Sequence, residues 1–416
     1  MSDVVVVGGG AIGLASAWRL AQRGLTVEVV DPSPGGGASG VAAGMLAPVT
    51  EARPGEEDHL RLGLASLARW PALVAELTDE LSDDAGLSYR EDGTVVVALD
   101  ADDRAALHEL VDRQRSLGLE VADLSTRDIR GLEPGLAPSV RRGALAATER
   151  SVDPAALVAA LLTAGESAGV RFRRERVEGL VARNLGRNRT DLSVSAEIST
   201  EGVGGVELAG GERLSAGTVV LAAGAWSGDV GGLPEPLRLP VRPVKGQVVT
   251  LRQRPGDTVV RQTVRGFVRG SSIYLVPRDD GRLVCGATVE ERGWDPVATA
   301  GASYELLRDV LTLFPGLDDA ELVGARVGFR PGSPDDLPLI GATGVDGMVV
   351  ATGHYRNGIL LAPITADAVA ASVTGEDLPP EVVPCDPRRF TDGADLASLV
   401  PESGRERRQN AEAVAR

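Results

Sequence analysis

The amino-terminal segment follows a strand–glycine–helix–strand pattern, and no other segment constrains the fold as much. Residues 4–7 are four consecutive valines, as expected for a strand that is buried on both faces of a parallel sheet. The glycine-rich turn GGGAIG follows at residues 8–13, and a helical stretch then runs to Gly24, a residue that often ends helices. A second apolar strand, residues 26–30, leads to Asp31. The sequence therefore predicts a βαβ unit of a parallel sheet covered by helices.

The spacing of the glycines and of Asp31 indicates what this unit binds. Gly8, Gly10 and Gly13 form GxGxxG, in which the three glycines permit a tight turn, close approach of a pyrophosphate, and helix–strand contact. The helix would point its positive end at the phosphates, and Asp31 lies where a carboxylate accepts hydrogen bonds from a ribose. We interpret the segment as dinucleotide-binding. A structural glycine turn in an unrelated βα unit is the alternative, and the pattern does not choose between FAD and NAD.

Composition limits the remaining possibilities. The chain has 416 residues, more than one hydrophobic core usually supports, and a net charge of −16. Such an excess of negative charge repels nucleic acid and anionic lipid, so we expect neither as a partner. The three histidines and two cysteines have no metal-ligand spacing, so no metal site is expected. Because no signal peptide and no membrane-spanning run is visible, we expect a cytoplasmic protein that does not contact the membrane.

The order of strand types predicts an α/β fold with two interleaved domains. Buried, parallel-type strands cluster at residues 1–50, 170–225 and 345–375, whereas alternating strands cluster near 90–100 and 240–330. We expect a discontinuous Rossmann-like domain from residues 1–85, 145–235 and 335–390. An inserted antiparallel-sheet α+β domain, for the substrate, would comprise residues 86–144 and 236–334. We also expect a polar hairpin or insert at 182–205 and a disordered tail at 401–416.

Two glycine-rich segments and two late arginines favour a flavin over a nicotinamide. TVVLAAGAWS at 218–227 is a buried strand that ends next to Gly224, and ASGVAAGMLAP at 38–48 is too poor in large side chains to form a core. A glycine stop and a mobile loop are the alternatives; backbone pressed against FAD is our interpretation. Near the other end, GFRPGSPDDLPLIG and ATGHYRNGILLAP carry Arg330 and Arg356. These arginines indicate an anionic substrate.

Together, these segments resemble the D-amino-acid-oxidase and glycine-oxidase family of FAD enzymes over residues 4–390. The motifs that match are GGGAIG, SGVAAGMLAP, PVKGQ at 243–247, YLVPR with GRLVCGAT within 274–288, GFRPGSPDDLPLIG and GHYRNGILLAP. The chain is most similar to the glycine oxidases of thiamine biosynthesis. Sarcosine oxidases and D-amino-acid dehydrogenases share the first glycines but usually differ after the final Gly-His. The resemblance implies that the Rossmann-like domain binds FAD.

The resemblance further implies which residues contact the cofactor. Ala11 and Ile12 would lie at the phosphates, Asp31 at the adenosine ribose, and the backbone of Val177 at the adenine. Residues 38–39 would belong to a loop that wraps the cofactor, and residues 43–45 and 354–360 would lie near the isoalloxazine ring. The whole set is Gly8, Gly10, Ala11, Ile12, Gly13, Asp31, Ala38, Ser39, Ala43, Gly44, Met45, Val177, Gly224, His354, Tyr355, Arg356, Asn357, Gly358, Ile359 and Leu360.

The same resemblance implies a substrate site without a catalytic acid or base. Arg330 would grip a substrate carboxylate, with Tyr274 alongside and Arg356 at the edge, because a guanidinium presents a planar pair of donors that fits a carboxylate. Each residue also has a structural alternative. Arg330 could pair with Asp335 or Asp336, Arg356 could order its own loop, and Tyr274 could be a core residue of the antiparallel sheet.

Three other residues carry weaker expectations. His354 is expected to pack against its surroundings rather than to act as a base. Trp226, in GAWSG, is expected in the core. Val289, directly after GAT, is expected to line the substrate pocket and to leave room for substrates larger than glycine.

The resemblance implies oxidation of glycine and small amino acids to an imine, with release of glyoxylate and ammonia. Dioxygen would be the final acceptor and give hydrogen peroxide, while thiazole synthase would be a partner that takes the imine. The resemblance is also compatible with a homo-oligomer. The alternatives are a D-amino-acid dehydrogenase, a sarcosine oxidase, and a non-catalytic flavin-binding regulator.

Overall fold

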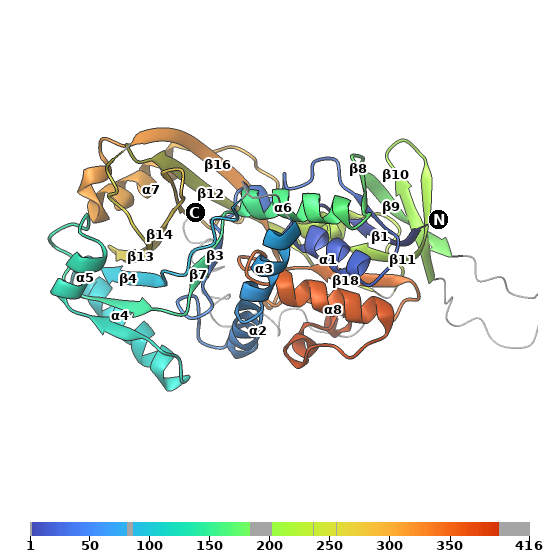
Figure 1. The fold of residues 1–416 in the computed structure, drawn as a ribbon, viewed down its shortest axis with the longest axis horizontal. Coiled ribbons are helices and arrows are strands. Elements are labelled where there is room, and N and C mark those ends of the chain that lie inside the picture. Colours follow the sequence, from blue (N-terminus) through green and yellow to red (C-terminus); the bar gives the residue numbers. More distant parts are fainter. Residues whose placement is uncertain (1, 81–85, 184–201, 236, 255, 391–416) are drawn as a thin grey trace, which may run out of the picture.

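The computed structural model describes residues 2–80, 86–183, 202–235, 237–254 and 256–390, and most of the strands in them form two large sheets (Figure 1). The predicted tail at 401–416 lies outside the described residues. Of the predicted insert at 182–205, only the flanks are described, and these belong to two strands that pair antiparallel.

The first sheet is built on β1 (Ser2–Val7), the predicted first strand. This strand pairs in parallel with β2 (Val27–Val30) on one side and β11 (Arg213–Leu221) on the other. The strand order is β17-β18-β11-β1-β2-β8, with β10 and β9 continuing from β11. The other strands are β8 (Arg171–Arg173), β9 (Val177–Arg183), β10 (Gly202–Leu208), β17 (Leu339–Ala342) and β18 (Met348–Thr352).

Both faces of β1 are buried, because successive side chains of a strand point to opposite faces. Val4 and Val6 belong to a core that includes residues of α1 (Ala11–Gln22), α6 (Pro154–Ser167) and α8 (Ala362–Thr374). Val5 and Val7 join a second core with residues of β10 and β11. Two further helices, α2 (Glu57–Leu67) and α3 (Trp70–Glu80), follow the first βαβ unit.

The second sheet has the order β16-β12-β15-β14-β13-β4-β6-β5. Its pairs are antiparallel, as predicted, except for β13 with β4, which run parallel. Its strands are β4 (Thr94–Ala98), β5 (Ala122–Leu124), β6 (Gly143–Ala146), β12 (Arg242–Arg252), β13 (Thr263–Val268), β14 (Ser271–Pro277), β15 (Arg282–Gly286) and β16 (Glu321–Gly332). The accompanying helices are α4 (Ala101–Ser116), α5 (Thr126–Leu132) and α7 (Ala300–Leu313).

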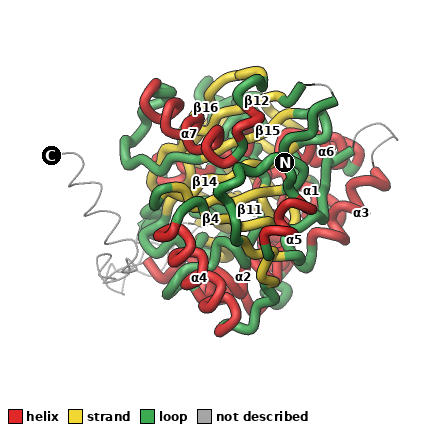
Figure 2. Tube along the Cα trace, turned by 90° about the vertical axis from the view of Figure 1, so that its left-hand side faces the viewer, coloured by secondary structure: helices red, strands yellow, loops and turns green. Residues whose placement is uncertain are grey.

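The two sheets lie at opposite ends of the long axis of the molecule, with α1, α6 and α8 over the first sheet and α4, α5 and α7 around the second (Figure 1). In the view along that axis the strands lie inside and the helices outside (Figure 2). A short pair, β3 (Met45–Leu46) with β7 (Arg150–Ser151), connects segments between them. The predicted domain boundaries stay a prediction; β6, a strand of the second sheet, crosses the expected boundary at residue 144.

Candidate active site

The glycine turn after β1 leaves the start of α1 open. Gly8 has φ +109°, and a Cβ there would lie 2.7 Å from the carbonyl carbon of Ala222, directly after the neighbouring strand β11. A Cβ at Gly13 would lie 3.0 Å from the carbonyl carbon of Gly8, so the helix rests directly on the turn. Gly10 is the N-cap and supplies no side-chain hydrogen bond. The helix therefore offers backbone N–H groups and its positive dipole end to an anion.

Asp31 and the segment after β2 close around this turn. The Asp31 carboxylate accepts hydrogen bonds from the backbone N–H of Gly9, at 2.6 Å, and of Ser33, at 2.7 Å. The Ser39 hydroxyl accepts from the N–H of Ala11 at 3.0 Å, which ties the predicted wrapping loop to the first turn of α1. The glycine-rich segment is thus held against the dinucleotide-binding turn.

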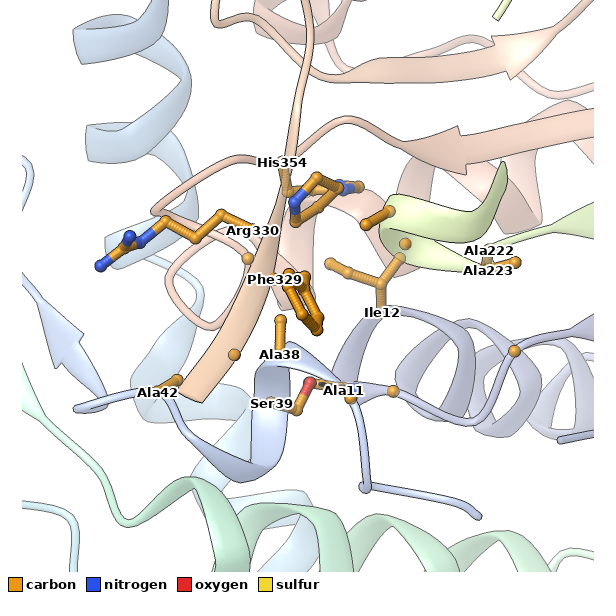
Figure 3. A pocket seen from close by; sticks show the side chains of 18 of the residues that line it. Ala11, Ile12, Ala38, Ser39, Ala42, Ala222, Ala223, Phe329, Arg330 and His354 are labelled. Atoms are coloured by element: carbon orange, nitrogen blue, oxygen red, sulfur yellow. Dashed lines mark hydrogen bonds between the residues drawn. The ribbon is translucent and has the colours of Figure 1, made fainter. Parts of the chain in front are cut away.

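A cavity of about 590 Å³ runs from this turn to the second sheet. The predicted residues that line it are Gly8, Gly10, Ala11, Ile12, Asp31, Ala38, Ser39, Ala43, Gly44, Met45, Val177, Gly224, Tyr274, Arg330, His354, Tyr355, Arg356, Asn357, Gly358 and Ile359. In Figure 3, Ala11 and Ser39 lie below, Ala222 and Ala223 lie to the right, and Arg330 extends to the left. One wall therefore comes from the glycine turn, and the opposite end comes from the strand β16.

Two of the residues predicted to contact the cofactor do not line the cavity. Gly13 lies under the turn, where it allows α1 to approach β1. Leu360 is buried, and its carbonyl oxygen accepts hydrogen bonds from the Ser66 hydroxyl at 2.7 Å and the Trp70 indole N–H at 3.0 Å. Leu360 thus fixes the 354–360 loop against α2 and α3.

Three glycines leave space on the face of the second sheet that borders the cavity. Gly246 and Gly328 are paired residues of β12 and β16, and Gly286 is on β15. A Cβ at Gly246 would lie 2.6 Å from the guanidinium carbon of Arg330, and one at Gly286 would lie 2.7 Å from Cζ of Tyr274. A Cβ at Gly328 would lie 3.0 Å from Cβ of Val41, in the wrapping loop. Because these glycines have no side chains, Arg330, Tyr274 and Val41 can lie close to the backbone of the sheet.

Arg330 is held by backbone and not by an acidic side chain. Its Nη1 donates to the carbonyl oxygens of Thr288, at 3.0 Å, and of Lys245, at 3.4 Å. Asp335, one of the partners considered above, binds Arg389 instead, with 2.8 Å between Oδ2 and Nε. Among the described residues, no ion pair of Arg330 is recorded. Its charge therefore faces the cavity with no carboxylate in ion-pair contact within the described part of the chain.

Tyr274 lies beside Arg330 with its phenol protonated. Burial raises the pKa of Tyr274 to about 12, although the charge of Arg330 acts in the opposite direction. A protonated hydroxyl is a hydrogen-bond donor, and together with the guanidinium it forms a site for a carboxylate.

Arg356 is enclosed by carboxylates. Its Nη2 lies 2.7 Å from Oε2 of Glu56, and its Nε lies 3.3 Å from Oε2 of Glu51. Its Nη1 is buried and has no hydrogen-bond partner among the described residues. Burial opposes ionisation of Glu56, but a hydrogen bond with His59 and the charge of Arg356 hold the pKa of Glu56 at about 2.

His354 and Tyr355 shape the loop before Arg356. His354 is buried and its Nε2 lies 3.0 Å from the Thr365 hydroxyl, while burial lowers the pKa of His354 to about 3. A neutral, enclosed imidazole agrees with the packing role expected for it. Tyr355 has φ +46°, which is strained for a residue with a side chain, and its N–H donates to the carbonyl of Pro331 at 2.9 Å. That bond holds the loop against the end of β16.

Two expectations about the cavity are wrong. Trp226 is not in the core: it is 38% exposed, lines the cavity, and stacks on Trp294 with 4.8 Å between ring centroids. Val289 does not line the cavity and is 56% exposed, although its neighbours Thr288 and Glu290 still pair with β12. A strand-end tryptophan has the same local pattern in a core and in a pocket wall, so the sequence offered no signal.

Sequence reasoning missed Glu51 and Phe329, which also line the cavity. Phe329 is in GFRPG next to Arg330, and its ring packs edge-on against Trp294 at 5.1 Å. Glu51 lies three residues after the glycine-rich segment at 38–48, but its partners are more than 200 residues away in sequence. Proximity to a motif was the only signal for either residue.

Other chemistries find little support in the part of the chain that the structure describes. No group of three or more potential ligands is placed to hold a metal, and no helix there is long and apolar enough to cross a bilayer. Cys285 and Cys385 are buried free thiols, and burial raises the pKa of each to about 12.

The residues present fit FAD. An open helix start suits a pyrophosphate, Asp31 at the end of β2 suits a ribose, and the largely small or apolar lining suits a flat ring system. The glycines at the turn leave space where a side chain would not fit.

Comparison with known proteins agrees with this fit. The family described as FAD dependent oxidoreductase, DAO, matches residues 3–372. The Bifunctional protein ThiO/ThiG of Synechocystis sp. is 35% identical over 94% of this chain but only 54% of that protein, so this chain spans about half the length of such relatives. Glycine oxidase of Geobacillus kaustophilus is 33% identical over 91% of this chain and 95% of that protein.

Solved structures show the same fold. The crystal structure of glycine oxidase from Geobacillus kaustophilus has a TM-score of 0.81 and covers 94% of this chain and 99% of its own, with 31% identity. The iminodiacetate oxidase of Chelativorans sp. has a TM-score of 0.78 at 26% identity and covers 92% of this chain and 98% of its own. The predicted α/β fold class, the FAD cofactor and the family resemblance are confirmed.

Proposed function

The chain belongs to the DAO family of FAD-dependent oxidoreductases, and we propose that it is an amino-acid oxidase acting on glycine and other small amino acids. One observation carries the proposal. The guanidinium of Arg330 lies on the cavity wall beside the protonated phenol of Tyr274, and no acidic side chain among the described residues pairs with it. A site built from these two donors suits the carboxylate of an amino acid.

The protein contributes orientation and electrostatics. Arg330 and Tyr274 bind the carboxylate, which fixes the α-carbon relative to the cavity wall opposite β16. Ala43, Val248 and Met45 line the cavity with apolar groups that exclude water from the bound amino acid. The substrate amine has to be neutral for its α-hydrogen to leave with an electron pair, and this deprotonation needs only solvent. No catalytic acid or base is assigned, and the low pKa of His354 argues against a role for it as a base.

When bound, FAD supplies the acceptor for the hydride equivalent of the α-hydrogen. Residues 8–13, Asp31, the wrapping loop at 38–45, Val177, Gly224 and the 354–360 loop would hold it. The substrate becomes an imine, and water converts the imine of glycine to glyoxylate and ammonia. With dioxygen as the final acceptor, the second product is hydrogen peroxide.

We also propose that the imine of glycine can feed thiazole formation for thiamine. The support is the name of the bifunctional ThiO/ThiG relatives, in which the segment similar to this chain is about half of the protein. A separate thiazole synthase would then be the partner of this chain.

The test is peroxide release from the purified holoenzyme with glycine, sarcosine and D-alanine, followed with a coupled peroxidase. We expect turnover of glycine, with loss of signal when dioxygen is removed. Turnover with an artificial quinone but not with dioxygen would make the protein a dehydrogenase. Oxidation of a nicotinamide with no response to any amino acid would refute the proposed function.

A further inference from the structure

One carboxylate, that of Glu51, engages two arginines at the substrate end of the cavity. Its Oε1 lies 2.8 Å from Nη1 of Arg265, and its Oε2 lies 3.3 Å from Nε of Arg356. Glu51 lines the cavity, whereas Arg265, on β13, does not. Both partners of Glu51 are mostly buried, with 17% and 13% of their side chains exposed. The carboxylate therefore lies at the cavity in contact with two cations, one of which, Arg356, also lines the cavity.

Charges alternate along this chain of residues, and the further positive charge of Arg53 acts on Glu51 and Glu56. Arg265, Glu51, Arg356 and Glu56 alternate in sign, and each neighbouring pair is in ion-pair contact. Arg330, which also lines the cavity, is bound by backbone carbonyls and forms no ion pair within the described residues. Tyr274 lies within the electrostatic influence of Arg330, Glu51 and Arg265, so these charges surround one region of the cavity.

Burial and its arginine neighbours act on Glu51 in opposite directions. Burial favours the neutral acid, but the charges of Arg265, Arg356 and Arg53 outweigh it and lower the pKa of Glu51 below its ordinary value. Glu51 is consequently an anion at any pH at which an amino-acid oxidase would be assayed. An approaching second carboxylate would therefore meet this fixed negative charge beside Arg356.

We propose that Glu51 determines substrate specificity by restricting the site to amino acids with a single carboxylate. The inference rests on the proposed function and adds a substrate class to it. Arg330 would accept one carboxylate, while Glu51 keeps Arg265 and Arg356 from accepting another. A dicarboxylate does not displace Glu51 easily. A free ligand loses translational and rotational entropy when it binds, whereas Glu51 is already held in place by the folded chain. Like charges brought together in a buried site add a further penalty.

Binding to the wild-type holoenzyme is the first test, since it needs no turnover. The ligands are glycolate, with one carboxylate, and malonate, with two, and both lack an amine. Isothermal titration calorimetry at pH 8 should give a Kd for malonate about ten- to a hundred-fold weaker than for glycolate, as expected for a like-charge encounter in a partly dry site. Equal or tighter binding of malonate would overturn the inference.

Glu51→Gln should reverse this preference. The amide keeps the shape but leaves Arg265 and Arg356 with a net positive charge, so malonate should gain at least about ten-fold relative to glycolate. Glu56→Gln is the matched control: it touches the same Arg356 but does not line the cavity, and the ratio should change by less than about two-fold. In the double variant Glu51→Gln/Arg265→Gln, most of this gain in malonate binding relative to glycolate should be lost. An unchanged ratio in a folded, flavin-loaded Glu51→Gln protein would refute the role of Glu51.

Turnover separates this inference from the proposed function. The wild type should oxidise glycine in preference to iminodiacetate, an amino acid with two carboxylates, and Glu51→Gln should shift kcat/KM toward iminodiacetate. If the wild type oxidises no amino acid, the proposed function fails, while the two Kd ratios still decide the role of Glu51. If Glu51→Gln does not fold, the wild-type ratio decides alone.

Discussion

Arg330 is the residue whose loss should affect the reaction most directly. A bidentate pair between a guanidinium and a carboxylate in a partly dry site contributes about 2–4 kcal/mol. Arg330→Ala should therefore lower kcat/KM for glycine by about thirty- to a thousand-fold, and Arg330→Lys should recover only part because the planar fork is lost. Steady-state kinetics on the flavin-loaded variants measures this.

Arg326→Ala is the control for Arg330, because Arg326 is an exposed arginine on the same strand, β16. It should leave kcat/KM for glycine unchanged. If Arg330→Ala oxidised glycine normally but unfolded more readily, Arg330 would have a structural role, and the carboxylate site would have to be built around Arg356.

Gly246 controls where the guanidinium of Arg330 lies. A Cβ at this position would come within 2.6 Å of both Cζ and Nη2 of Arg330. The end of a long side chain can move away, so Gly246→Ala should keep the fold and the flavin but displace the carboxylate grip. We expect KM for glycine to rise about ten- to a hundred-fold, with a smaller effect on kcat. Gly301→Ala, at a helical position with open space around it, should leave KM unchanged. An unaltered KM in Gly246→Ala would show that the position of Arg330 does not matter.

At the scale of elements, both faces of the strand β12 position other parts of the molecule. Gly246 faces Arg330, so its neighbours Lys245 and Gln247 face the other side, where α7 begins. The fully buried Lys245 Nζ lies 2.8 Å from Oδ2 of Asp295 and donates to the carbonyl of Val297, also at 2.8 Å. The Gln247 side chain accepts from the N–H of Thr299, the N-cap of α7. One strand thus fixes the cavity wall and the loop that carries Trp294.

Lys245→Met should loosen the loop at 289–299 without unfolding the protein. Methionine fills a similar volume but cannot donate to Asp295 or Val297, so amide exchange in this loop should become about ten-fold faster, equivalent to roughly 1.4 kcal/mol. Tryptophan emission should change as well, because Trp294 stacks on Trp226. Arg252→Met, an exposed change on the same strand, should alter neither signal. Exchange that stays as slow as in the wild type would show that Lys245 does not hold the loop.

At the scale of the whole molecule, the sequence predicted what depends on short-range pattern. The βαβ unit, the antiparallel second sheet and the Arg330 segment each have a local signature of glycines, valines or flanking prolines. The row formed by Gly246, Gly286 and Gly328 has none, because it arises from the register of three strands that are far apart in sequence. The contact of Glu51 with Arg356 likewise joins residues about 300 positions apart, which periodicity cannot predict.

The free energy of unfolding should depend on pH through one buried acid, Glu149. Its side chain is fully buried and accepts hydrogen bonds from the N–H of Thr50 at 2.6 Å and from the Thr50 hydroxyl at 2.9 Å. Burial outweighs these bonds and raises the pKa of Glu149 to about 7, from 4.5 in an unperturbed glutamate. The folded state therefore holds this proton more tightly than the unfolded chain does. The resulting contribution to the free energy of unfolding is complete below pH 4.5 and is lost as the pH rises through 7.

Glu149→Gln removes this dependence, because glutamine does not ionise. A pKa difference of this size corresponds to about 3 kcal/mol, so the free energy of unfolding of the variant minus that of the wild type should increase by about that amount between pH 4 and pH 8. Urea unfolding at a series of pH values measures this difference. The contribution of every other titrating group, including the buried Glu133, is the same in both proteins and cancels. The exposed Glu120→Gln should give a difference that does not change with pH. If the Glu149→Gln difference were equally flat, the pKa of Glu149 would be the same in the folded and unfolded protein, and the hydrogen bonds from Thr50 would fully offset its burial.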